Sequence, residues 1–302
     1  MTITWTQPIH RWGAIALVIT SLSACTATPT AIAPETSEEP TTTAESAESE
    51  TEGSDRIVAL TTLTADLVQT LDDEALVGMP GGPLTEDPRF AGITVVSEGR
   101  IEPDVEAIVA LEPDLVIGTG GFHDKVLARL AELGIAVLTV DVTSWDDLKA
   151  LTTDLAQRTA ADPAPLMARY DACLAQAPAS GPEALVLVSR QPLLSPNRDS
   201  WAGDFLAQFN IQNVTAALQG DSPFEGYITL PEEKVIVANP DTLIVVDTGE
   251  DLLAQLKADA FWGELDATQG DRVYSFDYFG LINPGSLASI EATCAQLAQL
   301  AQ

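Results

Sequence analysis

The sequence predicts an α/β protein with two Rossmann-like lobes built on parallel sheets. The chain has 302 residues, enough for two domains with real cores. Strand and helix patterns alternate along most of it, which is typical of parallel sheets covered by helices. One phrase also occurs twice, as GRIEPDVEAIVALEPDLVIG from Gly99 and as GYITLPEEKVIVANPDTLIV from Gly226. These observations together favour two similar lobes.

The two copies of the phrase share six of twenty residues without gaps. Each has a Pro near a helix start, an apolar-periodic turn, and a Pro-Asp pair that leads into an aliphatic strand. The copies lie 127 residues apart, too far for a solenoid repeat. The alternative is that such helix-strand phrases recur by chance in any α/β protein.

The first lobe is predicted at residues 55–142. Its expected elements, in order, are the strand RIVAL, the helix Leu63–Leu71, the strand Leu76–Met79, the first repeat with its strand LVIG, the helix Asp124–Leu133 and the strand AVLTV.

Residues 143–180 are predicted to form a helical connector. Ser144 with Asp147 forms a capping-box pattern for a helix to about Arg158, and Asp162-Pro163 is a second helix start. No strand pattern separates the two helices. The βα rhythm returns with ALVLV and ends in a helix from Leu287 to Ala301, so the second lobe is predicted at residues 181–302.

Residues 1–25 have the pattern of an export signal. A basic start at His10 and Arg11 precedes an apolar run, Gly13–Leu22, about half the ~20 residues of a membrane span. The ending LSAC resembles the bacterial lipoprotein signal, which implies that Cys25 is lipidated and anchors the chain to a membrane. Ordinary secretion with an accidental Cys is the alternative.

Residues 26–54 are rich in Thr, Ala, Ser, Pro and Glu, and this composition predicts a disordered acidic tether. The whole chain carries 45 acids against 14 bases, a net charge of −31. Such a surface repels phosphate backbones, so nucleic-acid binding is excluded.

Cys173 and Cys294 both fall in helical patterns. Export permits a disulfide, but spacing cannot place the two side chains together, and we expect buried thiols.

Nothing in the sequence assembles a reaction centre. His123 is the only histidine after residue 25, and no G-x-S-x-G elbow, P-loop, HExxH or zinc-type Cys cluster occurs. The GTGGF stretch lacks the last Gly of a dinucleotide fingerprint. An enzyme using His123 remains the alternative from another class. We expect no catalytic residue, no metal site and no cofactor.

A two-lobed α/β protein places its ligand at the carboxyl ends of its strands, in a cleft between the lobes. The residues at predicted strand ends are aromatics, hydroxyls and a few charges: Thr61, Thr62, Thr64, Phe122, His123, Arg190, Asp277, Tyr278 and Phe279. This set favours a large, partly apolar ligand over a sugar or an amino acid.

The lipoprotein ending, RIVAL, EAIVALEPDLVIG and the two-lobe rhythm together resemble one family. It is the family of substrate-binding proteins of ABC importers for ferric siderophores, cobalamin and haem. The resemblance covers residues 55–302. It implies two lobes joined by a single rigid connector helix, a monomer outside the cytoplasm, and delivery of the ligand to a permease dimer with a cytoplasmic ATPase.

The resemblance also implies roles for residues of the repeat. One Glu on each lobe, here Glu106 and Glu233, docks into Arg pockets of the two permease halves. The alternatives are a solvated helix face for Glu106 and a helix-start acid for Glu233. A two-subunit permease needs a matching acid from each lobe, which explains the repeated phrase.

The ligand-binding positions are carried over one by one. GRIEPDVE resembles hydroxamate-siderophore receptors, in which an Arg at the place of Arg100 donates to the metal-bound oxygens. Phe122 stands where those receptors have a Tyr, so stacking is kept without the hydroxyl. Tyr227 and Asp277-Tyr278-Phe279 match a Trp and an Asp-Trp-Phe of cobalamin receptors, but Leu281 replaces an Arg of that pattern.

The resemblance therefore implies a ferric siderophore, hydroxamate-like, as the ligand. A siderophore supplies all the oxygen ligands of its iron, so the protein needs only an Arg and rings. Cobalamin or haem is the alternative, and His123, Met79 and Tyr278 are the candidate axial ligands for haem. Trp201 and Arg198 are further candidates for ligand contact, with core packing and a solvated loop as their alternatives.

Overall fold

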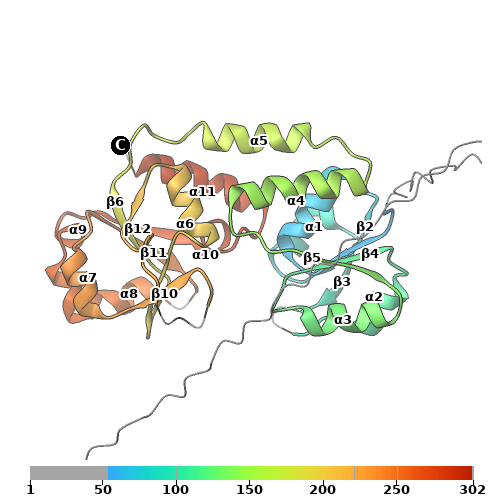
Figure 1. Cartoon of the computed structure of the whole chain (residues 1–302), viewed down its shortest axis with the longest axis horizontal. Helices are drawn as coiled ribbons and strands as arrows, with labels where there is room; N and C mark the ends of the chain where they lie inside the picture. The colour runs from blue at the N-terminus through green and yellow to red at the C-terminus, as the bar shows by residue number, and fades with distance from the viewer. Residues whose placement is uncertain (1–53, 99–100, 221, 223, 250, 301–302) are drawn as a thin grey trace, which may run out of the picture. The chain divides into compact units, whose positions relative to one another are not determined.

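The computed structural model describes residues 54–98, 101–220, 222, 224–249 and 251–300 (Figure 1). The predicted signal segment, nearly all of the tether, Cys25 and Arg100 therefore lie outside the described residues. None of the described helices is both long and apolar enough to cross a membrane.

The first lobe is built on sheet A, whose five strands run parallel in the order β3-β2-β1-β4-β5. These strands are β1 (Ile57–Ala59), β2 (Leu76–Pro80), β3 (Thr94–Ser97), β4 (Leu115–Gly118) and β5 (Ala136–Thr139). Its helices are α1 (Thr62–Leu71), α2 (Val105–Ala110) and α3 (Asp124–Glu132). Two 3₁₀ turns, Pro83–Glu86 and Pro88–Phe90, follow β2. The elements predicted for this lobe are all present, and the structure adds β3 and the two turns.

The second lobe is built on sheet B, four parallel strands in the order β12-β11-β6-β9. They are β6 (Glu183–Leu187), β9 (Gln212–Asn213), β11 (Thr242–Asp247) and β12 (Val273–Asp277). The helices are α6 (Trp201–Gln208), α7 (Glu232–Ala238), α8 (Leu252–Lys257), α9 (Asp266–Gln269), α10 (Tyr278–Leu281) and α11 (Leu287–Gln299), with a 3₁₀ turn at Ala260–Glu264.

A small antiparallel sheet has no counterpart among the described residues of the first lobe. It consists of β7 (Ser189–Arg190), β8 (Leu193–Pro196) and β10 (Tyr227–Leu230), in the order β10-β8-β7. Its strands are short, and β10 lies inside the second copy of the repeat. The antiparallel pairing of these strands was not predicted from the sequence.

The repeated phrase corresponds to a repeated unit of structure. Helix α2 starts at Val105 and α7 at Glu232, and strand β4 starts at Leu115 and β11 at Thr242, each pair 127 residues apart. The strand pairing keeps the same offset: Ile57 of β1 pairs with Leu115, and Ala184 of β6 pairs with Thr242. The predicted repeat is thus confirmed down to the register of the central strand pair.

The connector contains two helices, α4 (Trp145–Arg158) and α5 (Ala164–Leu174), visible along the top of Figure 1. Ser144 caps α4 as predicted, its Oγ accepting from the amide of Asp147 at 3.1 Å. Asp162 accepts from the amide of Ala164 at 2.9 Å and starts α5. Both predicted connector helices are present: α4 ends at Arg158, and Ala160, in the turn that follows, has a positive φ of 53°.

One hydrophobic cluster combines residues of α1, sheet A, α4, α5, α6, sheet B and α11. Its aromatic centre is Trp145, whose ring lies 5.5 Å from that of Trp201 and 5.2 Å from that of Phe205. Tyr170 of α5 joins it edge-on at 5.9 Å. The two connector helices therefore contribute side chains to the hydrophobic core.

Cys173 of α5 and Cys294 of α11 form a disulfide, with their Cα atoms 5.6 Å apart. The expectation of two buried thiols is wrong, because α5 packs along α11 and brings the two helical cysteines face to face. One turn away, Arg169 donates to Glu291 across the same pair of helices at 2.7 Å. Disulfides persist in oxidising compartments, so this bond agrees with an exported protein.

Candidate ligand-binding site

Two threonines follow β1 at the carboxyl edge of sheet A. The Thr61 hydroxyl caps α1, accepting from the amide of Thr64 at 3.2 Å and lying 2.8 Å from its hydroxyl. Thr62 is the first residue of α1, and both threonines are partly buried. Thr61 and Thr62 therefore lie at the predicted edge, but the hydroxyl of Thr61 already serves the helix start.

The loop after β4 carries the most exposed aromatic ring at this edge. The side chain of Phe122 is 84% exposed. Its neighbour His123 turns inward, and the ring Nδ1 accepts from the amide of Thr119 at 3.0 Å. Burial lowers the pKa of His123, so the imidazole is neutral at pH 7 and shapes the loop that presents Phe122. Among the described residues, no nucleophile is hydrogen-bonded to His123.

Three predicted residues come together where β12 ends at the carboxyl edge of sheet B. Asp277 accepts from the amide of Phe279 at 2.7 Å and so fixes the turn. The rings of Tyr278 and Phe279 meet edge to face with centroids 5.4 Å apart. Phe279 remains 37% exposed. Asp277 is thus engaged in backbone geometry, whereas the two rings form a surface.

Tyr227, the first residue of β10, is partly buried near Tyr278. Burial first, and then Tyr278, raise the pKa of Tyr227, so its hydroxyl stays protonated. We call Tyr227, Tyr278 and Phe279 the aromatic shelf. Phe224, three residues before Tyr227, is 55% exposed. It was not among the residues predicted from the sequence to contact a ligand. Its only signal in the sequence is an aromatic residue beside a Gly-Tyr pair.

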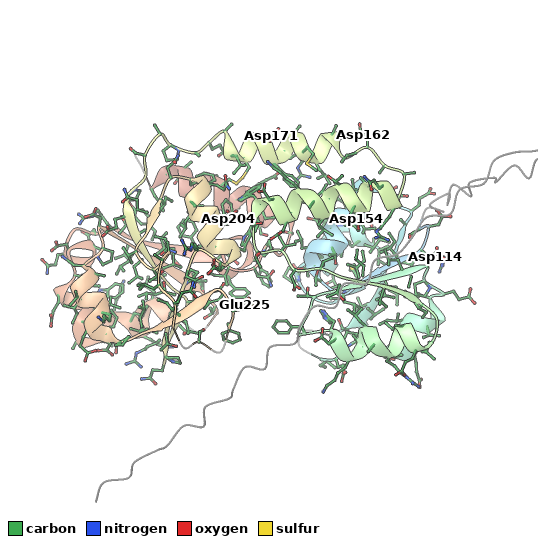
Figure 2. The ribbon with its side chains drawn as sticks, in the orientation of Figure 1. Asp114, Asp154, Asp162, Asp171, Asp204 and Glu225 are labelled. Atoms are coloured by element: carbon green, nitrogen blue, oxygen red, sulfur yellow. A yellow bond between two sulfur atoms is a disulfide. The ribbon has the colours of Figure 1, made fainter. Side chains whose placement is uncertain are left out.

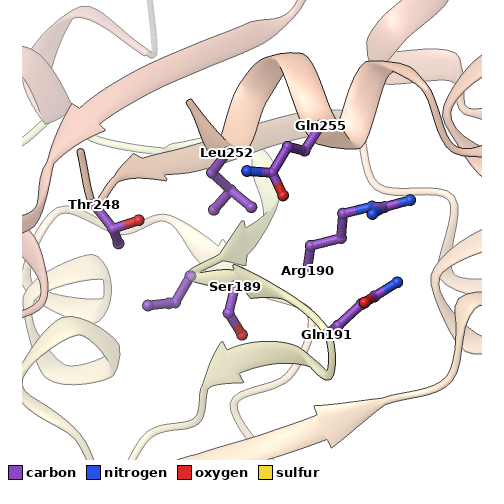
Figure 3. Close-up of a pocket in the computed structure, with 7 residues that line it drawn as sticks. Ser189, Arg190, Gln191, Thr248, Leu252 and Gln255 are labelled. Atoms are coloured by element: carbon purple, nitrogen blue, oxygen red, sulfur yellow. The ribbon is translucent and has the colours of Figure 1, made fainter. Parts of the chain in front are cut away.

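A pocket of about 200 Å³ opens at the carboxyl ends of β6 and β11 (Figure 3). Its lining residues are Val188, Ser189, Arg190, Gln191, Thr248, Leu252 and Gln255. Arg190 was predicted at this edge, and it is present, but its guanidinium donates to both carboxylate oxygens of Asp259, at 2.8 Å from Nε to Oδ2. That pairing lowers the pKa of Asp259 and raises the pKa of Arg190, so both groups stay charged and each balances the charge of the other. The pocket is smaller than an ordinary ligand site and suits one group of a larger ligand.

Trp201 and Arg198, the two further candidates for ligand contact, differ in burial. Trp201 is 3% exposed, and its Nε1 donates to the carbonyl of Gly280 at 2.8 Å. Its prediction as a ligand contact is corrected: the ring packs in the aromatic centre of the core. Arg198 is exposed, and its Nε lies 3.9 Å from Oδ1 of Asp199.

The two acids predicted to dock a permease are both exposed. Glu106 lies in the first turn of α2 and Glu233 in the first turn of α7. Neither carboxylate has an ion-pair partner among the described residues. The surface carries many other acids, among them those labelled in Figure 2. No cluster of metal-binding side chains occurs within the described ranges.

Comparison with known proteins identifies the family. The profile of the periplasmic binding protein family matches residues 57–278. The chain belongs to this family. Among curated proteins, it is 27% identical over 187 residues to the Fe(3+) dicitrate-binding periplasmic protein FecB of Escherichia coli (strain K12). That match covers 59% of this chain and 60% of the relative's length.

Solved structures share the fold of this family member. An ABC transporter substrate-binding protein from Listeria monocytogenes EGD-e superposes with a TM-score of 0.69 at 21% identity, covering 82% of this chain and 98% of that one. The periplasmic heme binding protein HutB of Vibrio cholerae gives 0.64 at 20%, covering 81% and 98%. The periplasmic vitamin B12 binding protein BtuF of Vibrio cholerae gives 0.59 at 21%, covering 82% and 98%. These likenesses establish the two-lobed architecture.

Proposed function

We propose that this protein is the substrate-binding lipoprotein of an ABC importer, and that it captures a ferric siderophore of the hydroxamate class for a membrane permease. The observation that carries the proposal is the aromatic shelf at the carboxyl edge of sheet B. Rings accept the organic shell of a large ligand by stacking and by burial of apolar surface. A siderophore brings its own oxygen ligands, so a site built of rings suits it.

The charges at the strand ends favour a hydroxamate over other iron complexes. Three hydroxamates neutralise ferric iron, whereas citrate and catecholate complexes are anionic. Arg190 is held by Asp259, and Asp247, Asp277 and Asp141 are exposed after their strands. An anionic complex would meet these carboxylates with little compensating positive charge. Arg100 lies outside the described residues, and we assign it the donor role toward the metal-bound oxygens of a neutral complex.

Haem or cobalamin is the second candidate, since family members named for each share the fold. Two of the haem ligands suggested by the sequence are disfavoured. Met79 is 1% exposed, and the Nδ1 of His123 accepts from the amide of Thr119, which leaves the proton of the neutral ring on Nε2. Tyr278 remains as an axial ligand, which keeps haem as an outcome for the test below.

The partners follow from the repeated unit. We propose that Glu106 and Glu233 dock the two permease halves, which face a cytoplasmic ATPase. Exposed ion pairs contribute only about 0.2 to 1 kcal/mol each, so these acids set orientation and encounter rate. We further propose that the receptor is a monomer outside the cytoplasm, held to the membrane by lipid on Cys25. The disulfide supports that location.

A tryptophan-fluorescence titration tests the ligand. Trp201 bonds the backbone beside the shelf and is a natural reporter. We expect saturable quenching by a ferric trihydroxamate, and much weaker binding of ferric dicitrate and of a ferric catecholate. Arg100→Ala should weaken the trihydroxamate by about 1.5 to 3 kcal/mol. Tightest binding of haem or cobalamin would instead establish the second candidate, and binding of none would remove the proposed ligand class.

A further inference from the structure

Asp66 of α1 is a carboxylate buried inside the hydrophobic core. Its side chain is 1% exposed. Charged groups are seldom buried unless paired, and burying one without partners is costly. Asp66 has two partners, and each takes one oxygen. Oδ1 accepts from Nη1 of Arg89 at 2.9 Å, and Oδ2 accepts from the backbone amide of Leu287 at 2.8 Å.

The two partners of Asp66 come from opposite parts of the chain. Arg89 lies in the 3₁₀ turn Pro88–Phe90, between β2 and β3 of sheet A. Leu287 is the first residue of α11 and follows Asp66 by 221 positions in the sequence. Asp66 thus joins the first lobe to the start of the last helix.

Helix α11 needs this external acceptor. Ser286 and Ser289 form a capping box, in which Ser286 Oγ accepts from the amide of Ser289 and Ser289 Oγ accepts from the amide of Ser286. The box leaves the amide of Leu287 without an acceptor from the helix itself, because the first amides of any helix lack one. Asp66 supplies it and adds a negative charge at the positive end of the helix dipole.

The segment just before α11 is the loop that carries two rings of the aromatic shelf. Residues 277–286, here called the shelf loop, contain Tyr278 and Phe279. Inside the loop the amide of Gly280 donates to Asn283 at 2.6 Å, and the amide of Asn283 donates to Tyr278 at 3.1 Å. The Phe279 ring lies on Gly285, where an added Cβ would come within 2.5 Å of it. Ring and backbone are therefore packed as one unit.

The shelf loop is attached to the core at two places. Near its start, Trp201 Nε1 donates to the carbonyl of Gly280 at 2.8 Å. Gly280, at φ +106°, lies so close to α11 that an added Cβ would approach the carbonyl of Ser289 to 2.4 Å. At its end, Asp66 holds Leu287. Both attachments are buried, and neither Trp201 nor Asp66 contributes exposed surface to the shelf.

We propose that Asp66 is a positioning residue for the ligand site: by capping α11 it fixes the shelf loop, and through Arg89 it couples that loop to the 3₁₀ turn Pro88–Phe90 between β2 and β3. The inference rests on the proposed function only in taking the shelf as the ligand surface. A rigid shelf binds without the entropy cost of ordering its rings, so loss of Asp66 weakens binding although Asp66 touches no ligand.

Hydrogen exchange in the ligand-free protein tests the positioning step. Asp66→Ala should speed exchange in a peptide covering the shelf loop and leave β1 and β4 unchanged. Asp66→Asn keeps an oxygen for Leu287 and loses only the ion pair with Arg89, so it should leave the shelf loop protected. Glu291→Gln is the matched control on α11, because it breaks the exposed pair with Arg169 and should not affect the loop. Equal exchange in Asp66→Ala and wild type would overturn the proposal.

Affinity for a ferric trihydroxamate is the second readout. We expect binding about tenfold weaker in Asp66→Ala, and within about twofold of wild type in Asp66→Asn. If Asp66→Ala does not fold, Asp66→Leu replaces the carboxylate with an apolar side chain of similar size and decides the question. Equal losses in Asp66→Asn and Asp66→Leu would show that only the ion pair matters and would overturn the capping role. Because the exchange readout uses no ligand, failure of wild type to bind the trihydroxamate would count against the proposed function alone.

Discussion

The two lobes share a helix-strand unit whose two copies lie 127 residues apart in the sequence. They differ at the strand ends where a ligand would bind. In the shared unit, α2 with β4 and α7 with β11 each present an exposed Glu in the first helical turn. At the strand ends, sheet A offers a loop with one exposed ring, Phe122. Sheet B offers the packed rings of the aromatic shelf and the added antiparallel sheet. The repeated part suits a partner with two like halves, and the differing part suits an asymmetric ligand.

The largest expected effect concerns the repeated unit. Reversing both acids, in Glu106→Lys with Glu233→Lys, should abolish import of the iron complex, because two repulsive contacts replace two attractive ones. Uptake of radioactive iron by cells carrying the variant measures this. Ligand affinity of the purified variant should equal that of wild type. Normal uptake would show that the repeat does not serve docking.

The next effect concerns the disulfide that joins helix α5 of the connector to helix α11 of the second lobe. The disulfide closes a loop with a sequence separation of 121 residues. Replacing both Cys173 and Cys294 by Ser should lower the free energy of unfolding by roughly 4 kcal/mol. Urea denaturation measures it, and wild type with reductant should match the variant. Unchanged stability would mean that the packing of α5 on α11 holds without the bond.

The exposed rings at the carboxyl edges of sheets A and B, Phe122 and Phe279, should differ in how much they stabilise the fold. Phe122→Ala and Phe279→Ala should each weaken ferric trihydroxamate binding by about 1 kcal/mol, through lost stacking. Only Phe279→Ala should also lower the melting temperature, because Phe279 packs on Tyr278 and Gly285 whereas Phe122 is almost fully exposed. Calorimetric titration and thermal unfolding separate the two. A loss of affinity confined to one variant would place the ligand on one lobe.

The smallest effect concerns His123. Burial lowers its folded pKa below the unfolded value of about 6.5, so the unfolded chain takes up the proton first. Stability should therefore fall as pH drops below about 6.5, and His123→Asn should flatten that slope. Unfolding at several pH values checks this. Ligand affinity at pH 7.5 should not change, and a large loss there would return His123 to the ligand site.

Local patterns in the sequence were sufficient to predict most of the fold. The buried strand LVIG, the cap at Ser144 and the Pro-Asp stops each act within a few residues, and the repeat revealed the second lobe. What the sequence could not reveal depends on contacts between distant segments. The pairing of Cys173 with Cys294 and the burial of Trp201 follow from how helices pack. The ion pair of Arg190 with Asp259 joins residues far apart in the chain, and so does the hydrogen bond between Asp66 and the amide of Leu287. No local spacing in the sequence predicts such contacts.

Hydrogen exchange of the wild-type protein with and without a ferric trihydroxamate tests most directly whether both edges hold the ligand. We expect slower exchange on binding in the loop of Phe122, after β4, and also in the shelf loop, with α2 and α7 unchanged. Protection limited to a single lobe, or found instead on the two helices that carry Glu106 and Glu233, would contradict it.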